Sequence, residues 1–193
     1  MAVVSSGQTQ IGWPMPSFKL LDCFGNLVAT DQYREALGLL VVFLCNHCPY
    51  VQHVADEISR LASESAASRI VTIGINSNDP ARYPEDDVVR MRDEVGRRGY
   101  TFPYLVDVGQ AVAREFGAVC TPDFYLFDKD RRLYYRGQLD GSRPGNGEPV
   151  TGKDLRLAAI GMLAGEPAPA LQIPSMGCTI KWAHKSANSA CPD

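Results

Sequence analysis

The residues with the clearest capacity for chemistry are two cysteines in the segment Cys45-Asn46-His47-Cys48. They follow an apolar run, residues 39–44, and precede Pro49 and a stretch with helical periodicity. This order predicts a strand, a dithiol and a helix. Two cysteines three positions apart on a first helical turn have Cα atoms about 5–6 Å apart, a separation that a disulfide can bridge. We therefore expect the pair to open and close a bond without moving the fold.

The position of the pair also predicts an activated thiol. A helix N-terminus presents unpaired N–H groups and the positive end of the helix dipole, and both stabilise a thiolate. His47 lies between the cysteines and would stabilise the thiolate further, which makes a disulfide easier to reduce. We hypothesise that the dithiol is more oxidising than that of thioredoxin, whose potential is about −270 mV. His53, one turn further along, is expected to lie on the surface.

A close pair of cysteines can instead be half of a zinc site, which needs two more ligands, normally as a second close pair. No such pair occurs among the remaining candidates, which are Cys23, Cys120, Cys178, Cys191, His53 and His184. Redox chemistry is therefore favoured, and no metal site is assigned. A non-enzymatic metal-binding or metallochaperone module is the alternative. In that case Cys45 and Cys48, with His47 or His53, would bind copper(I) or zinc.

Composition limits the size of the core, the partners and the location that the redox and metal-binding hypotheses can assume. The chain has 193 residues, 45% of them hydrophobic, which is enough for one sizeable core. A net charge of −3 with interspersed signs gives no reason to expect nucleic acid or a membrane as partner. The first ten residues lack the features of a signal peptide, so a cytoplasmic location is expected. In a reduced compartment, cysteines indicate catalysis or metal binding rather than a disulfide framework.

Patterns along the chain predict an α/β fold. An N-terminal hairpin (18–21 and 26–29) and a short helix (30–36) precede the apolar strand (39–44), and a strand (70–75) follows the helix after the dithiol. A helix should open at Pro84–Asp87 and end at Gly99, and another should run from 110 to 116. A second hairpin (124–127 and 133–136) and a helix (152–163) complete a mixed sheet covered on both faces. This order is typical of thioredoxin.

Two segments fall outside that order. Residues 141–152 are rich in glycine and proline and predict a long surface loop. The tail from 165 to 193 contains four prolines, so it should pack as an extended strap or remain mobile. The predicted organisation is one domain, 1–165, including the N-terminal hairpin, with a C-terminal extension, 166–193, packed on or near it.

A second motif makes a resemblance to the thioredoxin superfamily specific. Thr121-Pro122 stands just before the strand that opens the second hairpin, as in that superfamily, where the equivalent proline is cis and faces the dithiol. The resemblance implies that Thr121 and Pro122 border the substrate groove and that Cys120 lies close to it. X-Pro bonds in general are mostly trans.

The resemblance extends to a peroxiredoxin-like branch, the alkyl hydroperoxide reductase and thiol-specific antioxidant proteins. It covers almost the whole chain, in the segments 43–51, 76–79, 102–105, 120–123, 135–138, 142–146 and 175–182. A peroxiredoxin's reactive cysteine ends a Pro-x-x-x-Thr/Ser-x-x-Cys pattern. Cys48 resembles that cysteine, but Cys45 and Val41 occupy the hydroxyl and proline positions. Arg136 and Arg143 are candidates for the activating arginine.

The resulting prediction is a thiol–disulfide oxidoreductase of peroxiredoxin-like type that needs no organic cofactor. By resemblance to thioredoxin, Cys45 would be the exposed nucleophile and Cys48 would resolve the mixed disulfide. In the alternative, a thiol peroxidase, Cys48 would become a sulfenic acid and Cys45 would condense with it. Cys178 could add a resolving thiol if the strap folds back, or be inert. Expected partners are protein or small-molecule disulfides, or hydroperoxides, with a thioredoxin or glutathione system as electron donor.

Overall fold

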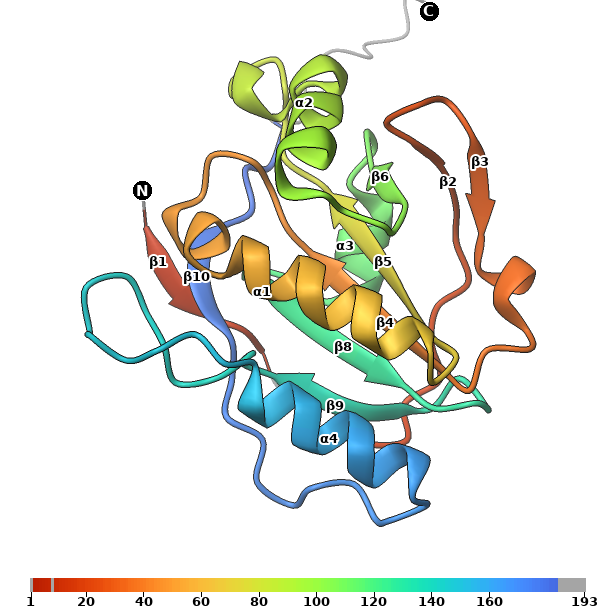
Figure 1. The fold of residues 1–193 in the computed structure, drawn as a ribbon. Helices are drawn as coiled ribbons and strands as arrows, with labels where there is room; N and C mark the ends of the chain where they lie inside the picture. Colours follow the sequence, from red (N-terminus) through yellow and green to blue (C-terminus); the bar gives the residue numbers. More distant parts are fainter. Residues whose placement is uncertain (1, 8, 184–193) are drawn as a thin grey trace, which may run out of the picture.

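The computed structural model describes residues 2–7 and 9–183, which form a seven-stranded mixed sheet with helices on both faces (Figure 1). The strand order is β3-β2-β6-β5-β4-β8-β9. The strands are β2 (Lys19–Asp22), β3 (Leu27–Ala29), β4 (Gly38–Phe43), β5 (Ile70–Asn76), β6 (Tyr104–Val106), β8 (Asp123–Phe127) and β9 (Leu133–Gly137). β5 pairs in parallel with β4 and β6, and the other pairs are antiparallel. The predicted thioredoxin-like α/β fold is confirmed.

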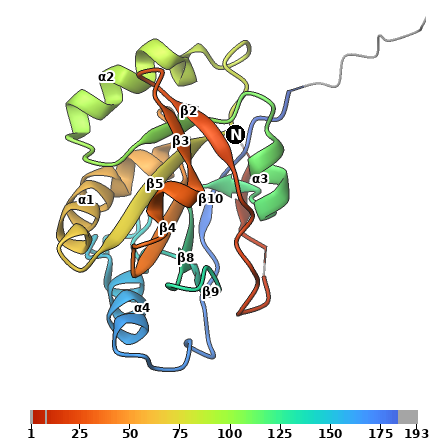
Figure 2. The same cartoon turned by 90° about the vertical axis from the view of Figure 1, so that its right-hand side faces the viewer.

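Four α-helices cover the sheet. They are α1 (Pro49–Ala66), α2 (Val88–Arg98), α3 (Ala111–Phe116) and α4 (Lys153–Leu163). The side view in Figure 2 shows α1, α2 and α4 on one face and α3 on the other. β4 is apolar throughout because both of its faces are buried. Leu40 and Val42 pack in the α1 and α4 core, whereas Leu39, Val41 and Phe43 pack in the α3 core.

Two of the predicted helices differ in extent from the expectation. The helix expected to open at Pro84 divides into a 3-10 turn, Pro84–Asp86, and α2, because Asp87 has extended backbone angles and accepts a hydrogen bond from the Arg90 amide as N-cap. Its predicted glycine end is confirmed, since Gly99 has a φ of +64°. The helix expected over 30–36 is a 3-10 turn, Thr30–Tyr33.

The N-terminal hairpin is confirmed and belongs to the main sheet, where β2 pairs with β6. β6 has no counterpart among the predicted strands, because its three residues are too few to show a pattern. Residues 141–152 contain no helix or strand, as expected of a loop. The Asp140 carboxylate organises this loop by accepting hydrogen bonds from the amides of Ser142, Thr151 and Gly152.

A second, three-stranded sheet joins the two ends of the described chain. β10 (Met176–Thr179) lies between β1 (Val3–Ser5) and β7 (Cys120–Thr121), and both pairings are antiparallel. The tail was expected to be an extended strap, and part of it forms a regular strand. That strand, β10, contains no proline. Cys191 and His184 lie outside the described residues. In the part of the chain that is described, no helix has the length and apolar character of a membrane span.

Candidate active site

The dithiol lies in the loop between β4 and α1, at the end of a buried strand. Cys48 is the N-cap residue of α1, and Pro49 occupies the first helical turn, where its missing N–H is tolerated. The expectation that both cysteines share a first helical turn is wrong, because Cys45 lies in the preceding loop. Asn46 anchors this loop: its amide donates to Asp86 Oδ1 at 2.7 Å and its side chain donates to the Glu85 carbonyl at 2.7 Å.

Both sulfurs contact Thr121. The Cys45 sulfur lies 3.3 Å from Thr121 Oγ1, and the Cys48 sulfur lies 3.2 Å from the Thr121 carbonyl oxygen. The Thr121–Pro122 peptide bond is cis, as the resemblance implied. Cys45 and Cys48 are only 2% and 0% exposed. The prediction of an exposed Cys45 is therefore wrong, because the Thr121 side chain covers the end of β4.

The surroundings of the two thiols shift their pKa values in opposite directions. A hydrogen bond from Cys45 lowers the pKa of Cys48 to about 5, against the opposing effect of burial. Hydrogen bonds from Cys178 and from the Val51 amide, at the start of α1, act in the same sense. Burial raises the pKa of Cys45 well above its ordinary value, and its hydrogen bond to Cys48 adds to the increase. Of the two thiols, Cys48 is therefore the one that ionises more readily.

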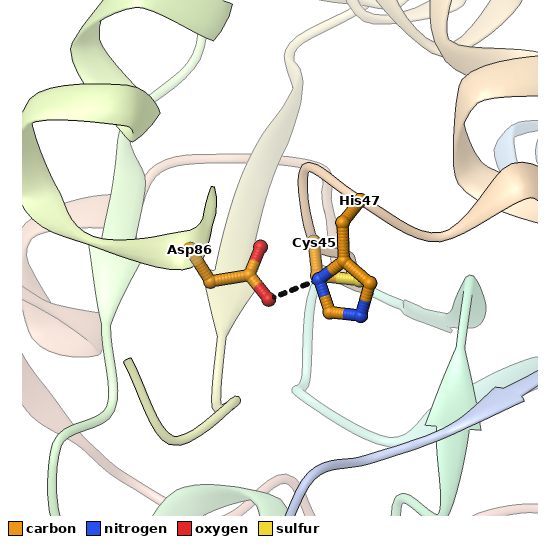
Figure 3. A group of neighbouring side chains, drawn as sticks. All are labelled: Cys45, His47 and Asp86. Atoms are coloured by element: carbon orange, nitrogen blue, oxygen red, sulfur yellow. Dashed lines mark ion pairs between the residues drawn. The ribbon is translucent and has the colours of Figure 1, made fainter. Parts of the chain in front are cut away.

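His47 forms an ion pair with Asp86, with Nδ1 2.7 Å from Oδ2 (Figure 3). Its ring also stacks on Tyr83, with centroids 5.1 Å apart. The hydrogen bond to Asp86 raises the pKa of His47, although burial opposes this. Burial would raise the pKa of Asp86, but hydrogen bonds from His47, Asn78 and Asn46 bring it below its ordinary value. A positive imidazolium next to the dithiol is thus favoured.

Cys45, His47 and Asp86 bring their potential ligand atoms within 4.8 Å of one another. Thiolate, imidazole and carboxylate are groups that zinc uses. The Asp86 oxygens, however, already accept hydrogen bonds from the Asn46 amide, from Asn78 and from His47. The protein's own bonds therefore account for this cluster. His53, the other histidine in the metal hypothesis, lies outside this cluster; it is half-buried and bonds Ser142 Oγ at 2.7 Å, so it is not simply on the surface.

Cys120 and Cys178 differ in their relation to the dithiol. Cys178 pairs with Thr121 across β7 and β10 and forms a hydrogen bond with the Cys48 sulfur. The tail therefore covers the dithiol. The Cys120 thiol instead faces the Pro122 carbonyl, at 3.9 Å. Burial raises its pKa far above the ordinary value.

Two clefts border the site. Pro122 lines one of them together with Tyr50, His53, Arg143 and Met176. His47 lines a more open groove, which continues along the acidic turn and the first residues of α2 to Arg97.

Of the two arginine candidates, Arg143 lines the Pro122 cleft. Arg136 forms a buried ion pair with Asp123 at 2.9 Å and lies over the Tyr125 ring, which packs in the α3 core. Arg136 is therefore on the opposite side of the sheet from Cys48, which packs in the α1 core.

Asp86 was not identified from the sequence. The run Pro84-Glu85-Asp86-Asp87 was interpreted as the acidic first turn of a helix, and Asp87 does have that role. The only signal that could have singled out Asp86 is its position shortly after the end of β5, on the same sheet edge as the end of β4.

A mixed sheet of this order, with a thiol pair at a helix start beside a cis-proline, defines a thioredoxin-like protein. Residues 11–136 match the AhpC/TSA family, and the chain belongs to that family. Family and fold together support a thiol-based redox role.

Two solved structures are similar over nearly their whole length. A hypothetical protein from Sinorhizobium meliloti 1021 is 42% identical, with a TM-score of 0.91, over 93% of this chain and 98% of that one. An uncharacterized conserved protein from Geobacillus kaustophilus is 44% identical, with a TM-score of 0.92, over 95% and 97%. Peroxidoxin BcpB from Mycobacterium tuberculosis is 18% identical, with a TM-score of 0.60, over 82% and 98%, and shares the fold. No curated protein matches the sequence.

Proposed function

We propose that this protein is a thiol–disulfide oxidoreductase whose redox centre is the Cys45–Cys48 dithiol. The observation that carries the proposal is a pair of neighbouring thiols, at and just before the start of α1, that both contact Thr121 beside a cis-proline and whose pKa values are displaced in opposite directions. This arrangement has one sulfur ready to attack and a second in position to complete the disulfide. A thioredoxin or glutathione system would restore the reduced form.

The pKa directions change the roles expected of the two cysteines. The Cys48 thiolate would attack a substrate disulfide, release one thiolate and form a mixed disulfide. Cys45, after losing its proton, would then attack the Cys48 sulfur and expel the second thiolate. The substrate gains two electrons, and the protein is left with a Cys45–Cys48 disulfide. A ring nitrogen of His47 lies within 4.8 Å of the Cys45 sulfur, and the imidazolium would favour the Cys45 thiolate electrostatically.

Burial of the Cys48 sulfur supports a second candidate, a thiol peroxidase. Because Cys48 is 0% exposed, a small hydroperoxide can approach it with less rearrangement than a protein disulfide. The thiolate would take one peroxide oxygen, giving a sulfenic acid and releasing an alkoxide or hydroxide that accepts a proton. Condensation with the Cys45 thiol would release water and give the same disulfide.

The test is a thiol count on reduced protein after a slight excess of hydrogen peroxide and, separately, after an oxidised dithiol. Wild type is compared with Cys45→Ser and Cys48→Ser. Rapid loss of two thiols with the dithiol substrate, abolished in Cys48→Ser, is expected of the oxidoreductase. Rapid loss with peroxide alone would favour the peroxidase. Reaction with neither would contradict both and favour metal binding, which metal analysis of protein purified under reducing conditions would detect.

A further inference from the structure

Cys48 has a second thiol neighbour besides Cys45, supplied from the far end of the chain. Cys178 lies on β10 in direct register with Thr121, the residue whose carbonyl oxygen lies 3.2 Å from the Cys48 sulfur. Cys178 packs in the same hydrophobic cluster as Cys48, and its side chain and backbone amide both lower the pKa of the Cys48 thiol. Cys178 is 3% exposed, so it meets Cys48 inside the protein rather than at the surface.

A close approach of two backbones brings Cys178 to this position. A Cβ atom on the preceding residue, Gly177, would lie 1.9 Å from the Thr121 carbonyl oxygen. Only glycine therefore allows β10 to lie this close to the cis-proline turn. The strand is also held beyond the cysteine, where the Ile180 amide donates to the Val119 carbonyl at 2.9 Å and the Lys181 amide donates to Asn78 Oδ1 at 2.8 Å.

We propose that Cys178 is a second resolving thiol for Cys48, so that Cys48 forms a disulfide either with Cys45 or with Cys178. This inference rests on the proposed redox function of the dithiol and adds a third residue to it. The chemistry is a disulfide exchange within one chain. The Cys178 thiolate attacks the Cys48 sulfur, a Cys48–Cys178 bond forms, and the Cys45–Cys48 bond breaks. Cys45 leaves as a thiolate and takes up the proton that Cys178 has lost, so no further oxidant is needed.

Where peroxide oxidises Cys48 directly, Cys178 forms the Cys48–Cys178 disulfide in one step. The Cys178 thiol condenses with the Cys48 sulfenic acid and releases water. A third thiol would thus protect Cys48 from further oxidation whenever Cys45 is already in a disulfide or is absent. It would also move the oxidised bond from the active-site loop to β10.

The electrostatics predict an order of events. In the reduced protein, burial raises the pKa of Cys178 to about 12, and its hydrogen bond to the Cys48 thiolate contributes to that increase. Cys178 is therefore protonated and inert while Cys48 is reduced. Oxidation of Cys48 removes the negative charge beside Cys178, and the nearby Lys181 ammonium then favours its thiolate. Cys178 becomes reactive only after Cys48 has reacted.

Tryptic mapping distinguishes the two disulfides. Trypsin should place Cys45 and Cys48 together in peptide 35–60 and Cys178 in peptide 157–181. A Cys45–Cys48 bond stays within the first peptide, whereas a Cys48–Cys178 bond joins the two. Protein treated with hydrogen peroxide and quenched in acid should show both forms in wild type, with the internal bond appearing first. Cys45→Ser should show only the cross-link, with two thiols lost.

The control is Cys120→Ser, whose thiol is also buried near the site but faces the Pro122 carbonyl and lies in peptide 115–129. It should leave the cross-link unchanged, and Cys178→Ser should abolish it. Two results would overturn the role of Cys178 and leave the proposed function intact. One is wild type that forms the Cys45–Cys48 bond but no cross-link. The other is Cys45→Ser in which Cys48 is over-oxidised and Cys178 can still be alkylated. Wild type without any disulfide at Cys48, both after hydrogen peroxide and after the oxidised dithiol, would overturn both.

Discussion

At the scale of single residues, Cys45 and Cys48 differ in the groups that donate to each sulfur. Both residues are almost fully buried, yet the pKa of Cys48 is lowered, because Cys45, Cys178 and the Val51 amide donate to its sulfur, whereas burial raises the pKa of Cys45. Spacing alone could not assign the two roles. The sequence shows that a thiolate is favoured at a helix start, but only the positions of the donors show which sulfur receives them.

Removal of the Cys45 donor should therefore raise the pKa of Cys48. A hydrogen bond to a charged group contributes about 1.5–3 kcal/mol, which corresponds to an increase of about 1–2 pKa units in Cys45→Ala. Cys45→Ser keeps an O–H donor and should show a smaller increase. The measurement is the pH dependence of iodoacetamide alkylation of peptide 35–60, in which Cys48 is the only cysteine of either variant. Equal pKa values in both variants and wild type would contradict the assignment.

Asp86 should control the charge of His47. Because the hydrogen bond to Asp86 raises the pKa of His47, Asp86→Asn should lower that pKa, and the fraction of imidazolium at pH 7 should fall. The measurement is an NMR titration of the histidine ring protons. His53, bonded to Ser142 and not to Asp86, supplies the internal reference signal. A His47 titration that does not move in Asp86→Asn would show that the ion pair does not set its charge.

At the scale of elements, the regular parts of the fold could be predicted and the short ones could not. β4 and α1 carry long, consistent patterns, namely an apolar run and a stripe at helical spacing. β10 has only four residues in a proline-rich tail, so its local sequence contains no strand signal. It forms because β1 and β7 supply hydrogen-bonding partners on both sides, and those pairings connect residues far apart in the chain.

Gly177 should be the least replaceable residue of β10. In Gly177→Ala the new methyl group would meet the Thr121 carbonyl, so the two strands must separate, at a cost of about 1–3 kcal/mol in the free energy of unfolding. Gly96→Ala is the matched control: Gly96 lies in α2 with no atom within 4 Å of an added Cβ, and alanine is the better helix former. Urea unfolding should show a loss for the first variant and no loss, or a small gain, for the second.

At the scale of the whole molecule, the low pKa of Cys48 should appear in the reduction potential. A stabilised thiolate makes the reduced form more favourable and the disulfide more oxidising. The potential should therefore lie above about −270 mV, by about 30 mV for each 1.4 kcal/mol of thiolate stabilisation. Equilibration with glutathione or dithiothreitol buffers at pH 7 measures it. A value at or below about −270 mV would contradict the hypothesis drawn from His47 and the helix start.

The same thiolate should make the stability difference between reduced and oxidised protein depend on pH. The folded pKa of Cys48 lies below its ordinary value of 9.0, so its contribution to the reduced form is complete above pH 9 and is lost as the pH falls through about 5. The oxidised form lacks this contribution, but its disulfide closes a short loop and restricts the unfolded chain by about 2 kcal/mol at any pH. The absolute difference in Tm therefore combines two effects, whereas its pH dependence reports the thiolate alone. Thermal unfolding of both forms should show that Tm of reduced minus oxidised protein decreases from pH 8 to pH 5 in wild type and in Cys120→Ser. A constant difference would mean that Cys48 is not ionised in the folded protein.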